Sequence, residues 1–314
     1  MENSLVIGSR GSKLALVQAQ IVKTQLQLLD PSVKISIEVI KTSGDVKSDP
    51  LSVIGGKGVF TKELEDALLD RRIDIAVHSL KDLPTALPQG LAIAAICKRE
   101  DPRDALILPI GASPKSLGLN SLRRNATVGT SSPRRMTQLR HVRPDLKIKD
   151  LRGNVDTRLR KLDEGQYDAL ILACAGLRRL GLEKRISVAL TTQQMLPAVG
   201  QGALAIEVRD DDEATTSVVA QLDHKFTRLA CLAERSLLRT LGGGCLLPIA
   251  AHAVVRDKRI KLEGLVTDTN GEHLVRHRLT GTFDEPEELG ARLAEHLLEN
   301  GARELLHQDS EERS

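Results

Sequence analysis

The sequence has very few aromatic side chains. Its 314 residues include no Trp and only four aromatic residues, which are Phe60, Tyr167, Phe226 and Phe283. Proteins that bind single-stranded nucleic acid by stacking need several exposed rings, so this composition argues against that class. The apolar content is still 41%, supplied by Leu, Ile, Val and Ala, which is enough to build packed cores.

Long apolar runs and closely spaced cysteines are also missing. No stretch of about 18 apolar residues occurs, so the sequence predicts no membrane-spanning segment. The first eight residues lack the basic and apolar regions of a signal peptide, and we therefore expect a cytoplasmic protein. The cysteines are Cys97, Cys174, Cys231 and Cys245. They are far apart, so we expect neither a disulfide framework nor a bound metal.

Charge is nearly balanced overall but unevenly distributed. The chain has 45 Lys and Arg against 42 Asp and Glu, a net charge of +3. Residues 123–185 hold 16 basic and 7 acidic residues, whereas residues 283–314 hold 3 basic and 10 acidic residues. A basic segment within a nearly neutral chain favours a site for a polyanionic ligand. From charge alone, a solvated charged face is an equally good explanation.

Apolar patterns alternate between strand and helix through the first two thirds of the chain. Strands are expected at residues 5–7, 35–39, 73–77 and 91–96, with helices beginning after Ser12 and Thr61. This order predicts an α/β domain with a largely parallel sheet. A second α/β unit is expected from strands at 126–129, 147–150 and 168–174 and helices near 134–142, 155–164 and 191–195.

The C-terminal part has a different pattern. A long helix is expected at about 223–241, and three glycines follow it. Strands are expected at 249–255, 259–266 and 273–280, and a final helix at about 285–299. These elements predict a smaller α+β domain.

Five polar loops follow expected strands, at residues 9–12, 78–82, 129–135, 151–154 and 176–179. Each combines Gly, Ser or Thr with Arg or Lys, which is the chemistry that binds carboxylates and phosphates. Ligands of open α/β sheets bind at the carboxyl ends of the strands. One such loop could be only a helix cap, but five in the same position favour an anion-binding site.

Asp82 and Cys245 differ from their surroundings. Asp82 follows Lys81 in one of these loops, where it would repel an acidic ligand unless it meets a positive centre during a reaction. A surface or capping aspartate is the simpler alternative. Cys245 follows three glycines on a loop, which suits covalent attachment or a nucleophile. The other three cysteines lie in apolar runs and are expected in cores.

Seven segments of the sequence together resemble the porphobilinogen deaminase (hydroxymethylbilane synthase) family. They are residues 55–60, 74–82, 99–104, 129–135, 151–158, 197–202 and 243–245, in the family's order. The resemblance implies a transferase that joins four porphobilinogen molecules head to tail into hydroxymethylbilane, releasing ammonia, in haem and tetrapyrrole biosynthesis. It also implies a dipyrromethane cofactor, attached to Cys245 by a thioether, that serves as the primer.

The resemblance further implies a fold of three domains. Two are α/β domains of the type II periplasmic-binding-protein kind with the active cleft between them, and the third is a smaller α+β domain with the cofactor cysteine. On this basis we predict domain 1 at residues 1–99 with about 200–218, domain 2 at 100–199 with a basic cleft face, and domain 3 at 219–314. We expect a monomer.

Matching positions to the family's motifs assigns roles to individual residues. The catalytic residues would be Asp82, Lys81 and Arg10. The cofactor would contact Lys57, Ser79, Thr130, Ser131, Ser132, Arg134, Arg135, Arg152 and Gly153. The substrate would contact Arg10, Ser12, Phe60, Arg152, Arg158 and Arg179. The acetate and propionate of each pyrrole account for the basic residues, and the Asp82 carboxylate suits positive charge on pyrrole nitrogens after ammonia has left.

Two other functions are compatible with parts of the sequence. A non-enzymatic anion-binding module of periplasmic-binding-protein type would need only the first two domains, but it explains neither Asp82 nor Cys245. Nucleic-acid binding through residues 123–185 ranks last, because the arginines lie in separate loops and aromatic residues are few.

Overall fold

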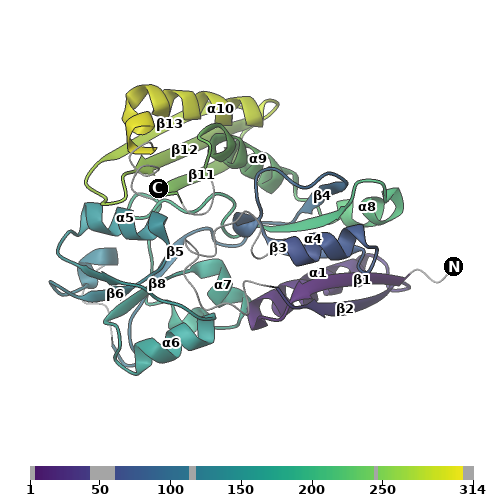
Figure 1. The fold of residues 1–314 in the computed structure, drawn as a ribbon, viewed down its shortest axis with the longest axis horizontal. Helices are drawn as coiled ribbons and strands as arrows, with labels where there is room; N and C mark the ends of the chain where they lie inside the picture. The colour runs from purple at the N-terminus through teal and green to yellow at the C-terminus, as the bar shows by residue number, and fades with distance from the viewer. Residues whose placement is uncertain (1–3, 43–60, 113–117, 244–246, 307–314) are drawn as a thin grey trace. The chain divides into compact units, whose positions relative to one another are not determined.

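Three β-sheets organise the part of the chain that the structure describes. This computed structural model describes residues 4–42, 61–112, 118–243 and 247–306. Residues 1–100 and 203–228 form one compact unit, and residues 101–202 and 229–314 form the other. The elements of each unit are labelled in Figure 1. Among the described helices, none has the length and apolar character that crossing a membrane requires.

The first unit contains a five-stranded sheet with the order β2-β1-β3-β10-β4. Its strands are β1 (Ser4–Arg10), β2 (Lys34–Ile40), β3 (Ile75–Ser79), β4 (Leu91–Ile96) and β10 (Leu204–Arg209). Strand β1 is parallel to β2 and β3, whereas β10 is antiparallel to both β3 and β4. The sheet is therefore mixed rather than largely parallel, because β10 enters from a distant part of the chain whose direction the local pattern does not reveal.

The helices of this unit begin and end near the predicted residues. Helix α1 (Lys13–Leu29) begins after Ser12, whose Oγ accepts a hydrogen bond from Ala15 N, and it ends at Asp30. Helix α4 (Lys62–Leu69) begins after Thr61 as predicted, but the Thr61 side chain makes no capping hydrogen bond. Helix α8 (Glu213–Ala220), which Asp212 caps, was not predicted from the sequence.

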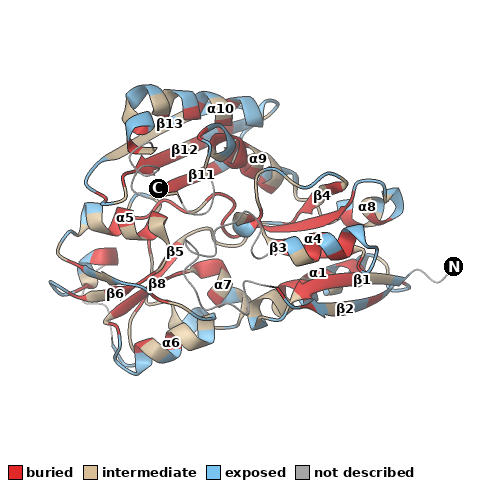
Figure 2. Ribbon diagram, viewed as in Figure 1, coloured by how far each residue is buried: buried red, intermediate tan, exposed pale blue. Residues whose placement is uncertain are grey.

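Helices α1 and α4 cover opposite faces of the sheet. Val22 and Leu26 of α1 pack with Ile75 of β3, whereas Leu64 of α4 packs with Ala76. Adjacent residues of a strand point to opposite faces, so β3 is buried on both sides. Figure 2 shows this burial along the central strands.

The second unit contains two sheets in its described residues. The five-stranded one has the order β7-β6-β8-β5-β9, which is arranged like the sheet of the first unit. Its strands are β5 (Asp104–Ile107), β6 (Thr127–Gly129), β7 (Lys147–Lys149), β8 (Ala169–Ala173) and β9 (Val188–Ala189). Strand β6 is parallel to β7 and β8, and β5 is antiparallel to β8 and β9. The helices are α5 (Pro133–Val142), α6 (Val155–Asp163) and α7 (Cys174–Arg179).

Two local predictions in this unit are wrong. Residues 191–195 form turns rather than a helix, because the side chains of Thr191 and Gln194 bind each other's backbone amides. Residues 176–179, expected in a loop, belong to the short helix α7.

The C-terminal elements are as predicted. Helix α9 (Lys225–Thr240) is followed by the antiparallel strands β11 (Ile249–Arg256), β12 (Arg259–Thr267) and β13 (Leu274–Thr282), and then by α10 (Pro286–Leu297). Leu237 of α9 and Leu293 of α10 are fully buried in one core with Leu262 of β12. Together with the two preceding α/β sheets, this core confirms the predicted fold class.

The turn between β12 and β13 packs against α5. Arg140 Nη1 donates to the Thr269 carbonyl oxygen at 3.1 Å, and His141 Nδ1 lies 3.3 Å from the Gly271 carbonyl oxygen. Gly271 has φ +76°, and a Cβ there would collide with the carbonyl oxygen of Thr137. The turn thus joins the C-terminal sheet to the helix that contains Arg134 and Arg135.

Candidate functional site

Five predicted site residues of the first unit lie at one edge of its sheet. Arg10 is the last residue of β1, and Ser12 caps α1 directly after it. Ser79 is the last residue of β3, and a single 3-10 turn, Leu80–Asp82, follows it. Because β1 and β3 are adjacent and parallel, their carboxyl ends meet at the same edge.

Buried contacts fix the turn that contains Lys81 and Asp82. Leu80 N donates to the Ala203 carbonyl oxygen at 3.0 Å, and Leu80 is only 1% exposed. Gln18 Nε2 of α1 donates to Ser79 Oγ at 2.9 Å. Asp82 itself is exposed and Lys81 is half-buried. The structure therefore presents a carboxylate next to an ammonium group on a rigidly held turn.

The predicted residues of the second unit gather at the corresponding edge of its sheet. Residues 130–132 follow β6, residues 150–154 follow β7, and α7 follows β8. Strand β6 lies between β7 and β8 and is parallel to both, so these three segments meet. The predicted residues at this edge are Thr130, Ser131, Ser132, Arg134, Arg135, Arg152, Gly153, Arg158 and Arg179.

The hydroxyl groups at this edge hold its loops together. Ser131 Oγ donates to the Leu151 carbonyl oxygen at 2.6 Å and accepts from Leu151 N at 2.9 Å. Ser132 N donates to Thr130 Oγ1 at 3.3 Å. The Ser131 side chain in the loop after β6 is thereby joined to the backbone of the loop after β7. This contact fixes the positions of the arginines that follow both loops.

Arg134 and Arg135 share a buried carboxylate, Asp104. Arg134 Nη1 donates to Asp104 Oδ2 at 2.7 Å, while Nε and Nη2 of Arg135 lie 2.9 and 2.7 Å from Oδ1. Gln201 Nε2 donates to the same oxygen at 3.0 Å. Burial alone would raise the pKa of Asp104, but the two guanidinium groups hold it well below its usual range.

This cluster contains one more positive than negative charge. Arg134 is 4% exposed, Arg135 is 7% exposed and Asp104 is fully buried. Burial lowers the pKa of Arg134, and the neighbouring Arg135 lowers it further. Arg134 Nε is buried without a hydrogen-bond partner among the described residues. Two buried cations with one anion favour a second, external anion at this place.

The sequence analysis gave Asp104 no role. An acidic residue at the start of the otherwise apolar strand β5 was the available signal, since a buried carboxylate needs cationic partners. Its two partners are 30 and 31 residues away in the sequence, so the pairing could not be read locally.

The remaining arginines of this edge are only partly buried. Arg152 Nε pairs with Asp150 Oδ2 at 2.8 Å, and Arg158 Nε donates to the Gly153 carbonyl oxygen at 2.7 Å. Arg179 Nη2 donates to the Gly202 carbonyl oxygen at 2.7 Å. These contacts orient the guanidinium groups at a surface that a carboxylate ligand can reach.

Three predicted site residues, Lys57, Phe60 and Cys245, lie outside the described residues. The other cysteines, Cys97, Cys174 and Cys231, are buried as predicted. Burial raises the pKa of the Cys174 thiol to about 12, so this sulfur is unreactive at neutral pH.

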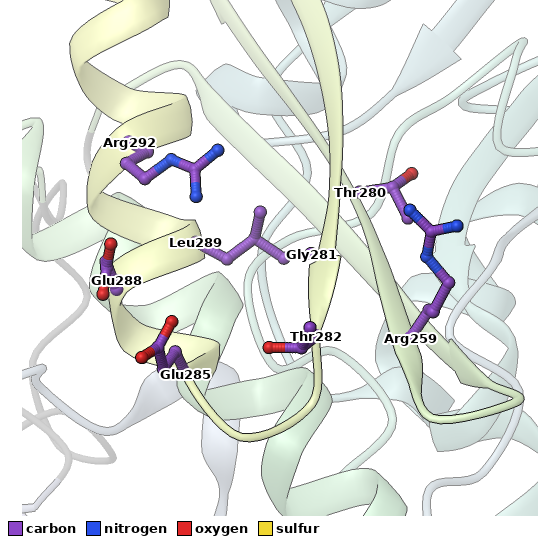
Figure 3. Close-up of a pocket in the computed structure, with 8 residues that line it drawn as sticks. All are labelled: Arg259, Thr280, Gly281, Thr282, Glu285, Glu288, Leu289 and Arg292. Atoms are coloured by element: carbon purple, nitrogen blue, oxygen red, sulfur yellow. The ribbon is translucent and has the colours of Figure 1, made fainter.

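A cavity of about 230 Å³ lies beside α10 and β13 (Figure 3). Arg259 and Arg292 contribute positive charge to its lining, and Glu285 and Glu288 contribute negative charge. All four are exposed, and none of the predicted site residues that the structure describes lines the cavity. With balanced charges on exposed side chains, it lacks the features of the anion-binding edges described above.

Comparison with known proteins gives two matches to family models. Residues 5–217 match "Porphobilinogen deaminase, dipyromethane cofactor binding domain", and residues 228–299 match "Porphobilinogen deaminase, C-terminal domain". A curated relative from Syntrophobacter fumaroxidans, named porphobilinogen deaminase, is 47% identical over 303 residues, covering 96% of each chain.

Similar solved structures include the periplasmic VFT2 domain of BvgS from Bordetella pertussis and the effector binding domain of BenM with benzoate. The first has 15% identity and a TM-score of 0.41, covering 70% of this chain and 87% of the other. The second has 17% identity and a TM-score of 0.43, covering 70% of this chain and 92% of the other.

Proposed function

Because this chain belongs to the porphobilinogen deaminase family, we propose that it joins four porphobilinogen molecules head to tail into hydroxymethylbilane and releases ammonia. The observation that carries the proposal is the 47% identity to a porphobilinogen deaminase along 96% of both chains. The two polar sheet edges support it, since one contains an exposed carboxylate and the other an excess of arginines.

The described residues suit a dipyrromethane group. Each of its two pyrroles bears an acetate and a propionate, so the group is a polyanion. The buried cluster of Asp104 with Arg134 and Arg135 has an excess positive charge, and Arg134 Nε has no hydrogen-bond partner among the described residues; a bound carboxylate would supply the missing anion. When bound, the group supplies the terminal pyrrole ring to which substrate is added.

We also propose which residues hold this group. Ser79, Thr130, Ser131, Ser132, Arg134, Arg135, Arg152 and Gly153 would bind it, with Lys57, and Cys245 would attach it through a thioether. The thiol of Cys245 is the candidate because the other three cysteines are buried in cores. Cys245→Ser is therefore expected to fold but not to consume porphobilinogen.

Other residues of the chain would bind the substrate and stabilise charge during the reaction. Arg10, Ser12, Phe60, Arg152, Arg158 and Arg179 would bind the acetate and propionate groups and the ring of the substrate. Lys81 would contribute positive charge beside them. Asp82 would stabilise the positive charge that develops on the substrate's pyrrole nitrogen as ammonia leaves, and accept a hydrogen bond from that N–H. A preorganised carboxylate does this without the reorganisation that water would need.

Asp82→Asn tests this role, because the amide keeps the size of the side chain and removes its charge. Losing one electrostatic group of this kind costs about 3–4 kcal/mol of barrier, so turnover is expected to fall by at least about 100-fold. Ammonia and hydroxymethylbilane are measured together. Asp70→Asn, an exposed acidic residue of the same unit, is the matched control and should turn over normally.

Near-normal turnover in Asp82→Asn would remove Asp82 from the mechanism. A wild-type protein that binds porphobilinogen but releases no ammonia would contradict the enzymatic function itself and favour the non-enzymatic anion-binding module.

A further inference from the structure

Three titratable side chains are buried on one face of the sheet beside β3, the strand that leads into the turn containing Asp82, and the proposed reaction does not use them. His78 Nε2 of β3 lies 2.9 Å from Glu207 Oε2 of β10, and these side chains are 4% and 0% exposed. Glu65 of α4 is 7% exposed and lies near both. Buried ionisable groups with no evident structural necessity are candidates for a functional role.

The strand register explains how His78 and Glu207 meet. Strands β3 and β10 are antiparallel, with His78 opposite Ala205 and Ala76 opposite Glu207. His78 and Glu207 are therefore diagonal neighbours on one face of the sheet. Ala76 packs with Leu64 of α4, so this is the face that α4 covers.

Burial makes the contact between the two side chains strong. A carboxylate that is fully removed from water is retained only with a donor or cationic partner, and His78 is the partner that the structure gives to Glu207. Breaking the contact would leave a buried group unsatisfied. The pair thus clamps β3 to β10 one residue before Ser79 and two before the turn.

We propose that His78 and Glu207 form a positioning pair that fixes the turn containing Lys81 and Asp82. Gln18 holds Ser79 from the α1 face of the sheet, and the pair holds His78 from the α4 face. The two contacts together fix the end of β3 on both sides. This role rests on the proposed function, because its consequence for catalysis is a correctly placed Asp82.

Glu65 is buried beside the pair. Burial raises the pKa of Glu65, and the adjacent Glu207 carboxylate raises it further. Oε1 of Glu65 and Oε1 of Glu207 are both buried without a hydrogen-bond partner among the described residues. The contact with His78 Nε2 is thus the side-chain hydrogen bond that the described residues give to Glu207.

Glu207→Gln tests the proposal with little change in shape. Small displacements of a catalytic group are costly, so kcat is expected to fall on the order of tenfold while KM for porphobilinogen stays within about twofold. Amide hydrogen exchange in a peptide containing residues 79–83 should become faster, because β3 and β10 would be held less firmly and Leu80 N bonds to Ala203, the residue directly before β10.

The matched control is Asp74→Asn. Asp74 Oδ1 accepts from Arg209 Nη2 at 3.1 Å, and Asp74 Oδ2 accepts from Val6 N at 2.9 Å. These contacts hold the other end of β3 and β10, away from Asp82. Asp74→Asn should lower the stability of the unit but leave both kcat and the exchange of residues 79–83 unchanged.

A second pair of variants separates hydrogen bonding from folding. His78→Gln retains an N–H donor toward Glu207 and is expected to keep most of kcat, whereas His78→Leu should lower kcat about as much as Glu207→Gln. If Glu207→Gln does not fold, the comparison of His78→Gln with His78→Leu tests the proposal instead.

Two results would overturn the proposal. One is equal kcat and equal exchange in Glu207→Gln and Asp74→Asn, and the other is equal kcat and equal exchange in His78→Gln and His78→Leu. A wild-type protein without turnover would contradict the proposed function instead, and the exchange measurement would still test the positioning role.

Discussion

One buried carboxylate, Asp104, holds Arg134 and Arg135 at the second sheet edge. It binds both guanidinium groups and Gln201, and it begins a strand that is otherwise apolar. The two arginines outnumber it, so the buried cluster keeps one uncompensated positive charge, which is unfavourable unless another anion binds there. This pairing holds two long side chains in fixed positions.

Asp104→Asn should destabilise the protein by about 3–5 kcal/mol at pH 7, because two buried cations lose their anion. The pKa of Asp104 lies below its ordinary value, so its contribution is complete above that value and is lost as the pH falls through the acidic range. The difference in free energy of unfolding between wild type and variant should therefore shrink below about pH 4. Denaturant unfolding across pH measures it.

Asp163→Asn is the control for this variant. Asp163 pairs with Arg185 at 2.8 Å in the same unit, but both side chains are partly exposed. Its loss should cost less than about 1 kcal/mol. Equal losses in the two variants would contradict the account of Asp104.

Many residues of the candidate site can be predicted from the sequence. Those that were missed depend on contacts between residues far apart in the chain. Arg134 and Arg135 could be found because they follow a Gly-Thr-Ser-Ser segment in a family motif. Asp104 and Glu207 could not, since each acts through a partner brought close only by the sheet. The cofactor and substrate contacts assigned by matching the family's motifs stay predictions.

Among the secondary-structure elements, the turn between β12 and β13 has a specific role as a joint. It receives hydrogen bonds from Arg140 and His141 of α5, the helix whose first turn contains Arg134. Gly271 permits this close approach, because any side chain there would meet the backbone of α5. The C-terminal sheet and the arginine-bearing helix are thereby held together within the second unit.

Gly271→Ala should weaken this joint. The new methyl group would collide with the Thr137 carbonyl oxygen, and a residue with φ +76° is strained in addition. We expect a lower thermal midpoint and faster amide exchange in α5. Gly165→Ala isolates the second effect, since Gly165 has φ +79° but nothing within 4 Å of a Cβ. Equal losses in the two variants would show that backbone strain, not the contact with α5, explains the effect.

The types of the helices and strands and most of their boundaries could be predicted from the sequence. The direction of β10 and the non-helical segment 191–195 could not. The apolar period of α1, with Ser12 before it and Asp30 after it, gave the helix to within a residue. Residues 191–195 have a helical pattern, yet the Thr191 and Gln194 side chains compete for the backbone. The antiparallel direction of β10 depends on contacts with β3 and β4, far away in the sequence.

For the whole molecule, the uneven charge now has a structural explanation. Within the basic segment 123–185, ion pairs engage acidic residues that include Asp145, Asp150, Asp163, Glu164 and Asp168. Because basic residues outnumber acidic ones by 16 to 7, internal pairing cannot neutralise the segment. A segment with excess positive charge is what a polyanionic ligand would need, and the binding of such a ligand here stays a prediction. The predicted domain boundaries, monomeric state and cellular location stay predictions.

The proposed activity builds a tetrapyrrole on a dipyrromethane primer attached to Cys245. The mass of the intact protein, measured on the same preparation that is assayed for porphobilinogen turnover, tests it most directly. The account predicts an excess over the sequence mass that corresponds to two linked pyrrole units in the wild-type protein, and no excess in Cys245→Ser. An active wild-type protein with an unmodified mass, or an excess that persists in Cys245→Ser, would contradict it.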